Sequence, residues 1–353
     1  HGPRPLPLFL DMLRSETAGS PENYTAAMAG LQAYQTAARP PAPPAAVAVH
    51  HAGPARLLDH GGVGRPVVLV PSLINPPDIL DLAPRSLARW LAAQGFRVLL
   101  VDWGTPQPGD RDRDIADHVA DTLVPMIAAL DQPPILVGYC LGGTIATAAA
   151  ALTPVAGLAT IAAPWHFAGY DKGRPAIAEL WRAAQPACAT MGLVPMEVLQ
   201  AGFWRLDPAR TVAKFAAFGT MAPDSAAAQA FIRLEDWANA GAPLPYAVGC
   251  DLFDRFIRDD EPGAGRWCVR DTVIDPLALT CPTIAFVSAT DRIVPAATAA
   301  RVAVRHDLTI GHVGMIVGSR AMAALWTPLA HWAATLDSAP LEPAALEPAA
   351  PRA

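Results

Sequence analysis

Residues 135–144 constrain the fold of this chain more than any other stretch. A short apolar run, Ile-Leu-Val, leads into Gly-Tyr-Cys-Leu-Gly-Gly-Thr, and an Ala-rich pattern with helical spacing follows through Ala151. A strand, a sharp turn and a helix around Gly-x-Cys-x-Gly are typical of a nucleophile elbow. The turn holds its central residue in a strained backbone conformation, so the residues two positions away must be small. Gly138 and Gly142 meet this requirement, which predicts an elbow with Cys140 at its tip.

The side chain at the tip is a thiol, and two interpretations of it are open. Free cysteine is often a small, inert core residue, and Cys140 could be one. A reactive role is favoured by its position, because the predicted helix begins directly after it and a helix N-terminus stabilises a thiolate. Since a strand precedes the motif and a helix follows it, we interpret Cys140 as a nucleophile.

The composition indicates a globular protein with a large core and argues against several function classes. Hydrophobic residues make up 52% of the 353 residues, charged residues 16%, and the net charge is −6. With no basic cluster, nucleic-acid binding is not expected. The five cysteines are scattered without a C-x-x-C pair, so we expect no disulfide framework, no zinc site and a reducing, cytoplasmic compartment.

Nothing in the sequence predicts export or a membrane span. No signal peptide is recognised at the start. The longest apolar stretch, Thr144 to Pro164, is interrupted by Pro154 and Gly157, which divide it into a helix and a strand. We therefore interpret it as core and expect no transmembrane segment.

Short apolar strands alternate with helical patterns through much of the chain. Strands are predicted at Val67–Val70, Arg97–Val101, Ile135–Val137, Gly157–Ile161 and Thr283–Ser288. Helices are predicted at Asp81–Gln94, Ile115–Leu130 and Ser319–Ala334, with another after Pro295 through about Val304. This alternation implies a mostly parallel sheet with helices on both faces, whose reactive groups lie at the carboxyl ends of the strands. Together with the elbow, it predicts an α/β-hydrolase fold.

Between residues 164 and 265 the alternation of strands and helices is lost, and the sequence is rich in Trp, Phe, Met and Pro. We interpret this region as a cap inserted over the sheet, with short and irregular helices. Its aromatic residues either form a second core or line a substrate route, and we expect most of them to form a core. The predicted organisation is an N-terminal helical and Pro-rich segment at 1–44, core at 45–163, cap at 164–265, core at 266–336 and a disordered tail at 337–353.

A nucleophilic thiol needs a base, a group that orients the base, and donors for the oxyanion. Asp291 follows a late predicted strand and His312 lies in the next loop, so the order nucleophile, acid, histidine is that of α/β-hydrolases. His166 is the competing histidine, and Asp102 at a strand end is the competing acid. The backbone N–H of Leu141 is one predicted oxyanion donor, and a second is expected near Leu73 or Ile74.

With these residues placed, the chain resembles the polyhydroxyalkanoate synthases, which polymerise 3-hydroxyacyl-CoA. The closest motif is Gly-Tyr-Cys-Leu-Gly-Gly-Thr at 138–144, which resembles the cysteine lipase box of that family. The other stretches that carry the resemblance are Pro71-Ser72-Leu73-Ile74-Asn75, Ile79-Leu80-Asp81-Leu82, Asp102-Trp103-Gly104, Asp291-Arg292-Ile293-Val294-Pro295 and Gly311-His312-Val313-Gly314. The resemblance covers about Val67 to Trp332 and is weakest in the cap.

The resemblance implies a function and a set of site residues. It implies an acyltransferase in which Cys140 takes the acyl group from 3-hydroxyacyl-CoA, His312 is the base and Asp291 orients it, with a polyester as product. It implies no metal or redox cofactor. The same motifs supply candidate substrate-binding residues: Asn75, Asp102, Trp103 and Tyr139. Either a homodimer or a separate partner subunit is expected, and the surface of polymer granules is a possible location.

The chain also departs from the family, and rival functions stay open. By its size we expect it to correspond to the catalytic subunit of the two-component synthases rather than to the single-subunit enzymes with their long N-terminal domain, and Ser72 stands where the family has the second proline of a Pro-Pro pair. One rival is a thioesterase or esterase of the same fold, in which water resolves the acyl-Cys. Another is a non-catalytic, granule-associated interaction protein that keeps the motifs by descent.

Overall fold

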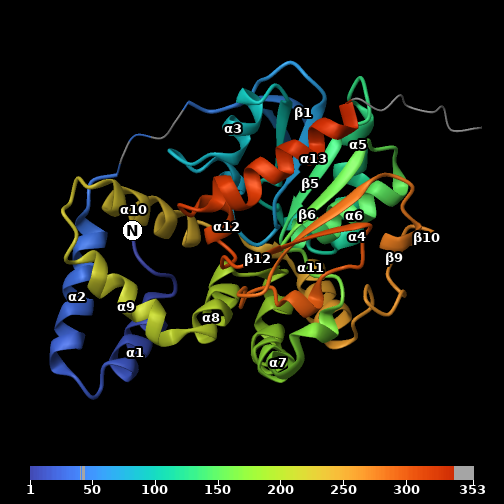
Figure 1. Ribbon diagram of the computed structural model, residues 1–353. Helices are drawn as coiled ribbons and strands as arrows, with labels where there is room; N and C mark the ends of the chain where they lie inside the picture. The colour runs from blue at the N-terminus through green and yellow to red at the C-terminus, as the bar shows by residue number, and fades with distance from the viewer. Residues whose placement is uncertain (40, 42–43, 338–353) are drawn as a thin grey trace, which may run out of the picture.

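The computed structural model describes residues 1–39, 41 and 44–337, and its centre is an eight-stranded sheet (Figure 1). The order of the strands is β1-β2-β4-β3-β5-β6-β11-β12. Neighbours from β4 to β12 run parallel, whereas β1 and β2 pair antiparallel. The bounds are β1 Val47–Ala52, β2 Ala55–Asp59, β3 Pro66–Val70, β4 Arg97–Asp102, β5 Ile135–Tyr139, β6 Gly157–Ile161, β11 Thr283–Ser288 and β12 Val304–Leu308. The predicted α/β-hydrolase fold is confirmed.

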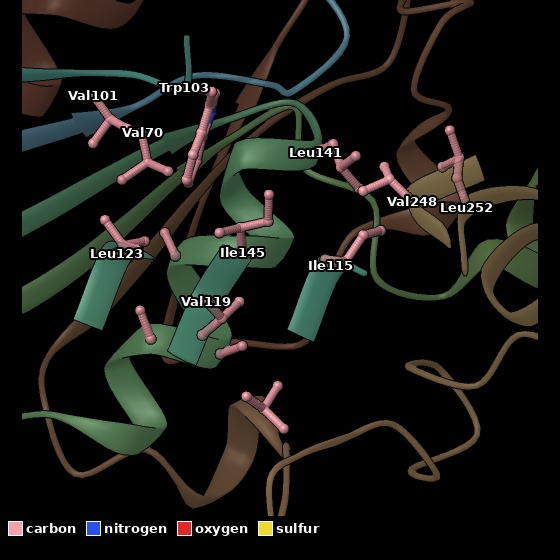
Figure 2. Packing of buried hydrophobic residues seen from close by; sticks show 14 of the residues in the cluster. Val70, Val101, Trp103, Ile115, Val119, Leu123, Leu141, Ile145, Val248 and Leu252 are labelled. Atoms are coloured by element: carbon pink, nitrogen blue, oxygen red, sulfur yellow. The ribbon is translucent and has the colours of Figure 1, made fainter. Parts of the chain in front are cut away.

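Alternate residues of each central strand enter two separate hydrophobic cores, as expected from the two-residue period of a strand. On one face, Val68 and Val70 pack with the helices around 115–128 and with α6 (Leu141–Leu152). Figure 2 shows Ile145 of α6 against this face, with Leu141 beside Val248 of the cap. On the other face, strand residues pack with α3 (Leu87–Ala93) and with the C-terminal segments α12 (Gly314–Val317), η8 (Met322–Trp326) and α13 (Thr327–Asp337).

The region between β6 and β11 is helical, and several of its helices are long. Its elements are η4 Phe167–Gly173, α7 Arg174–Met191, α8 Met196–Leu206, α9 Pro208–Phe218, α10 Ala226–Ala238, α11 Tyr246–Cys250 and η5 Asp251–Arg258, with the short strands β7 Leu193–Val194 and β8 Leu244–Pro245. Because α7 has 18 residues, the prediction that these helices would all be short is wrong.

The two N-terminal helices, α1 (Leu6–Glu16) and α2 (Pro21–Thr36), pack against this helical region, and Figure 1 shows them beside α9. The ring of Phe9 lies 5.4 Å from that of Trp204 and 5.0 Å from that of Phe215. The Tyr34 hydroxyl donates to Asp236 (2.6 Å). Ser20 caps α2, since its side chain accepts the Asn23 N–H (3.2 Å). The N-terminal segment and helices α8–α10 therefore share one hydrophobic core.

Two other predicted elements differ from the structure. The helix expected from Asp81 begins at Leu87, because Pro84 interrupts the segment and Ser86 then caps the helix by accepting the Arg89 N–H (2.9 Å). The helix expected through Val304 is only a 3-10 turn, η7 (Ala296–Thr298). After that turn, Ala299 forms a bridge to Pro164, and this tertiary pairing keeps the chain extended. The predicted tail lies beyond 337, outside the described residues.

Substituting Gly30 with alanine tests the contact between the N-terminal helices and α9. A Cβ at Gly30 would lie 1.8 Å from the Phe215 carbonyl oxygen, so the two backbones would have to separate. Alanine in a helix interior normally stabilises by about 1 kcal/mol relative to glycine. We expect the opposite sign here, with overpacking destabilising by about 1–3 kcal/mol in urea unfolding.

Gly202 in α8 provides the matched control for Gly30→Ala. A Cβ there would meet only the end of the flexible Leu180 side chain, at 3.2 Å. We therefore expect Gly202→Ala to be neutral or stabilising. If both variants were equally stable, α2 and α9 would not be in backbone contact.

Candidate active site

Cys140 occupies the tip of a strand–turn–helix, directly between β5 and α6. Its φ is 56° and its ψ is −134°, a conformation that side-chain-bearing residues rarely adopt. A Cβ at Gly138 would lie 2.4 Å from the Gly143 Cα, and one at Gly142 would lie 2.1 Å from the Val70 carbonyl oxygen. These close approaches explain why glycine is required on both sides of the cysteine. The Cys140 N–H donates to the carbonyl of Ile161 (2.9 Å), which fixes the turn to the neighbouring strand.

Asp291 and His312, separated by 21 positions, form a buried pair at the same edge of the sheet. Asp291 follows β11 and His312 follows β12, and these strands are neighbours. The His312 Nδ1 lies 2.6 Å from the Asp291 Oδ2. The other carboxylate oxygen, Oδ1, accepts the N–H groups of Ile293 (2.8 Å) and Val294 (3.0 Å). The carboxylate is therefore held on both oxygens, and the imidazole has one defined orientation.

The electrostatics of His312 depend on both Cys140 and Asp291. Burial lowers the pKa of His312, but the charge of Cys140 and hydrogen bonds to Asp291 and Cys140 raise it, and the result is a pKa of about 10. The imidazole is thus disposed to take up a proton and hold it. A thiol next to a carboxylate-paired histidine is the arrangement that nucleophilic acyl transfer needs.

Tyr139 supports His312 from the strand that leads to the elbow. Its ring stacks on the imidazole with centroids 4.9 Å apart, and its hydroxyl donates to the His312 carbonyl (3.2 Å). Burial raises the pKa of Tyr139 well above its ordinary value, so the phenol stays neutral and donates its proton. This contact adds a positioning role to the substrate-binding role predicted from the sequence.

Cys140 and His312 line a common cavity of about 210 Å³ between the sheet edge and the helical region. Its wall is mostly apolar, with a few polar groups that lie on α8, on α9 and on the loop after β3. The other lining residues are Ser72, Ile74, Asn75, Tyr139, Gln200, Phe203, Trp204, Thr211, Lys214, Trp237, Ala238, Ile293 and Val313.

Two polar residues of this wall, Gln200 and Lys214, were not identified from the sequence. Lys214 Nζ lies 2.6 Å from the buried carboxylate of Glu235. Gln200 lies on one face of α8 with Phe203 and Trp204, three and four residues on. Helical spacing could have grouped these residues, but it does not say which face meets the cavity.

The predicted substrate-binding residues separate into two groups. Asn75 and Tyr139 line the cavity at Cys140. Asp102 instead accepts from the Gly104 N–H (2.9 Å) and pairs with Arg56, and it lines a neighbouring cavity. The Trp103 Nε1–H donates to the Pro71 carbonyl (3.0 Å), so this indole holds the loop after β3.

The loop after β3 holds the predicted second oxyanion donors. The Ile74 N–H donates to the Ser72 Oγ (3.1 Å). Within the part of the chain that the structure describes, no acceptor is found for the N–H of Leu73 or of Leu141. Both of these N–H groups are therefore available to a bound oxygen, and their role as oxyanion donors stays a prediction.

The competing histidine lies apart from this cluster. The His166 N–H donates to the Thr298 carbonyl (2.9 Å), and the side chain is not among the described residues that line the cavity.

In the described ranges 1–39, 41 and 44–337, no cluster of three or more His, Cys, Asp or Glu residues could hold a metal ion. No helix in those ranges is long and apolar enough to span a membrane.

Cys140 is expected to react with alkylating reagents faster than the other four cysteines. Burial raises the pKa of Cys188, Cys250 and Cys281, which lowers their thiolate fractions. Cys268 is exposed and serves as the internal control. With limiting iodoacetamide and peptide mapping by mass spectrometry, we expect Cys140 to be labelled about tenfold faster than Cys268. Equal labelling of Cys268 would contradict an activated thiol at the elbow.

Comparison with known proteins agrees with this fold. The family model described as the alpha/beta hydrolase fold matches residues 65–184. The poly(3-hydroxyalkanoate) polymerase subunits PhaC of Haloferax mediterranei and Haloarcula marismortui are 30% and 28% identical over 76% of this chain. The same subunit of Synechocystis sp. is 27% identical over 76% of this chain and 77% of its own length.

The matched region covers 58% and 60% of the two archaeal relatives, so this chain corresponds to about three fifths of each. The resemblance drawn from the motifs is confirmed by these comparisons. The chain has the α/β-hydrolase fold, and the relatives it resembles are poly(3-hydroxyalkanoate) polymerase subunits.

Proposed function

We propose that this chain is an acyltransferase of the polyhydroxyalkanoate synthase type, which polymerises 3-hydroxyacyl-CoA through an acyl-Cys140 intermediate. One observation carries the proposal: Cys140 at the elbow and His312, which is hydrogen-bonded to Asp291, line the same cavity. The named activity of the relatives supplies the substrate class. The geometry of Cys140, His312 and Asp291 supports acyl transfer in two steps.

The first step transfers the acyl group from CoA to the protein. His312 takes the thiol proton of Cys140 on Nε2 while Asp291 holds the Nδ1–H. The sulfur attacks the thioester carbonyl carbon, and the carbonyl π electrons move to the oxygen. When this intermediate collapses, the bond from carbon to the CoA sulfur breaks, and the CoA thiolate takes the proton from His312.

The second step forms the ester. The 3-hydroxyl of an incoming 3-hydroxyacyl-CoA attacks the acyl-Cys140, and His312 removes the hydroxyl proton. The bond to Cys140 then breaks, and its sulfur recovers the proton from His312. The product is an ester one unit longer that still carries CoA, so it can acylate Cys140 again.

The cavity wall favours attack by a hydroxyl over attack by water. Phe203, Trp204 and Trp237 cover the site with large apolar surfaces. The Lys214 charge on this wall is neutralised by Glu235. A low-polarity cavity excludes water and holds an acyl chain, which is the property that polymerisation needs.

The proposal extends to partners and location. Because the relatives are named as subunits, we propose that this chain acts with further chains, either a second copy or a different subunit. The product is an insoluble polyester, so we propose that the protein works in the cytoplasm at the surface of polymer granules.

The deciding experiment follows two products from one reaction with 3-hydroxybutyryl-CoA. Released CoA is measured with a thiol reagent, and the acyl product is separated into free acid and polymer by chromatography. We expect CoA release to be matched by polyester. Stoichiometric free acid with no oligomer, even with candidate partner subunits added, would indicate a thioesterase instead. No CoA release would indicate a non-catalytic protein.

A further inference from the structure

Ser72 lies against the nucleophile elbow, although no motif singled it out as functional. It follows β3, which pairs with β5 so that Val70 is opposite Gly138. Pro71, the first residue after β3, also lies close to the elbow, because a Cβ at Gly142 would lie 2.5 Å from the Pro71 carbonyl oxygen. The indole N–H of Trp103 donates to that same carbonyl (3.0 Å). Ser72 is therefore held on a fixed loop beside the first turn of α6.

The hydroxyl of Ser72 can still donate one hydrogen bond. Only 7% of the residue is exposed, and it lines the cavity together with Cys140 and His312. Its Oγ accepts the Ile74 N–H (3.1 Å), which fixes the oxygen but leaves its own proton free to donate. Across the described part of the chain, no acceptor is found for this proton. A hydroxyl proton beside a cavity is available to an acceptor on a bound molecule.

We propose that the Ser72 hydroxyl is an oxyanion donor for the reaction at Cys140. As the Cys140 sulfur bonds to the acyl carbon, the carbonyl oxygen takes the π electron pair, and the Ser72 O–H donates to it beside the Leu141 N–H. Ser72 keeps its proton throughout, and the hydrogen bond weakens when the carbonyl re-forms. The Ile74 N–H then positions Ser72 and does not itself contact the oxyanion.

This assignment rests on the proposed function only in taking the acyl donor to be a thioester. The donor is useful to any acyl group that Cys140 attacks, because the developing charge is the same. A proline at position 72 would offer neither an N–H nor an O–H, so the serine gives this chain a donor of its own.

The test separates transition-state donation from a structural role with three measurements on Ser72→Ala and Ser72→Thr. The first is CoA release from 3-hydroxybutyryl-CoA, resolved into kcat and KM. The second is inhibition by butyraldehyde, which adds to the thiol as a hemithioacetal whose oxygen occupies the oxyanion position. The third is alkylation of Cys140 by iodoacetamide, a reaction that develops no oxyanion.

For Ser72→Ala we expect kcat to fall on the order of 10²-fold with KM nearly unchanged. The affinity for butyraldehyde should fall with kcat, while the alkylation rate stays at the wild-type value. Ser72→Thr keeps a hydroxyl and should recover most of both losses. Unchanged butyraldehyde affinity in Ser72→Ala would overturn the proposal, and so would a parallel fall in alkylation, which indicates a disordered loop.

Ser86→Ala is the matched control, because Ser86 is also a buried serine whose Oγ accepts a backbone N–H, but it caps α3 outside the described cavity lining. We expect it to lower Tm without changing kcat or butyraldehyde affinity. If the wild-type protein releases no CoA, the proposed function fails. The butyraldehyde affinities still decide the role of Ser72, and a wild-type Cys140 that binds no aldehyde counts against it.

Discussion

We expect Cys140→Ala to release no CoA from 3-hydroxybutyryl-CoA, and His312→Ala to lose on the order of 10³-fold or more in kcat/KM. Without the thiol there is no acceptor for the acyl group. Without the imidazole, nothing takes the thiol proton or returns it to the leaving CoA. The two residues act as one unit, so the double variant is expected to be no worse than Cys140→Ala alone. The measurement is the initial rate of CoA release, with acylation of the protein followed by intact mass.

His166→Ala is the control for the histidine assignment, since sequence order alone left His166 as a competitor. Its backbone N–H is bonded to the Thr298 carbonyl (2.9 Å), and its side chain lies outside the described cavity lining. We expect this variant to keep wild-type kcat/KM. An inactive His166→Ala together with an active His312→Ala would show that the base has been misassigned.

The parts of this molecule that local patterns determine were predictable from the sequence. Strands β6 (Gly157–Ile161) and β11 (Thr283–Ser288) have the bounds that their apolar runs predict. The elbow was predictable because Gly138 and Gly142 are needed there for close backbone approach, a requirement that can be read from residue type. The order of Asp291 and His312 after successive strands indicated that they meet, and they lie 2.6 Å apart.

The remaining features depend on contacts between distant segments, which local patterns do not specify. In the sequence, Phe9 and Tyr34 have no feature that distinguishes them from other helix residues. In the structure they pack on Phe215 of α9, which is about two hundred positions later in the sequence. The Lys214–Glu235 pair joins two different helices, so no spacing rule links it. Likewise, Ser72 is an unremarkable loop residue until the structure shows what its hydroxyl accepts and what it faces.

Asp291→Asn is expected to impair turnover more than the first acylation. The amide oxygen can still accept the N–H groups of Ile293 and Val294, but the amide nitrogen then faces His312 Nδ1 as a donor. This contact favours the imidazole tautomer with its proton on Nε2. That nitrogen then has no free lone pair to take a proton from Cys140 or from the incoming 3-hydroxyl. The corresponding change with a hydroxyl nucleophile costs about 10⁴-fold in kcat. A thiol needs less activation than a hydroxyl, so we expect kcat to fall on the order of 10²-fold in Asp291→Asn.

The same variant is expected to change how stability depends on pH. Burial lowers the pKa of His312, but Cys140 and then Asp291 raise it, and the net change is from 6.5 to about 10. A raised pKa in the folded protein stabilises it fully below about pH 6.5, and this stabilisation is lost as the pH rises toward about 10. In Asp291→Asn the pKa of His312 falls, so this stabilisation is smaller and is lost at lower pH.

The readout is the difference in Tm between the wild-type protein and Asp291→Asn across that range of pH. We expect the difference to be largest at the acidic end and to shrink as the wild-type imidazole loses its proton. Asp236→Asn is a suitable comparison, because Asp236 pairs with Tyr34 and Arg39 away from the histidine, and its effect should not follow the titration of His312. A Tm difference for Asp291→Asn that stayed constant across the range would mean that Asp291 does not hold the proton of His312, even if the variant were inactive.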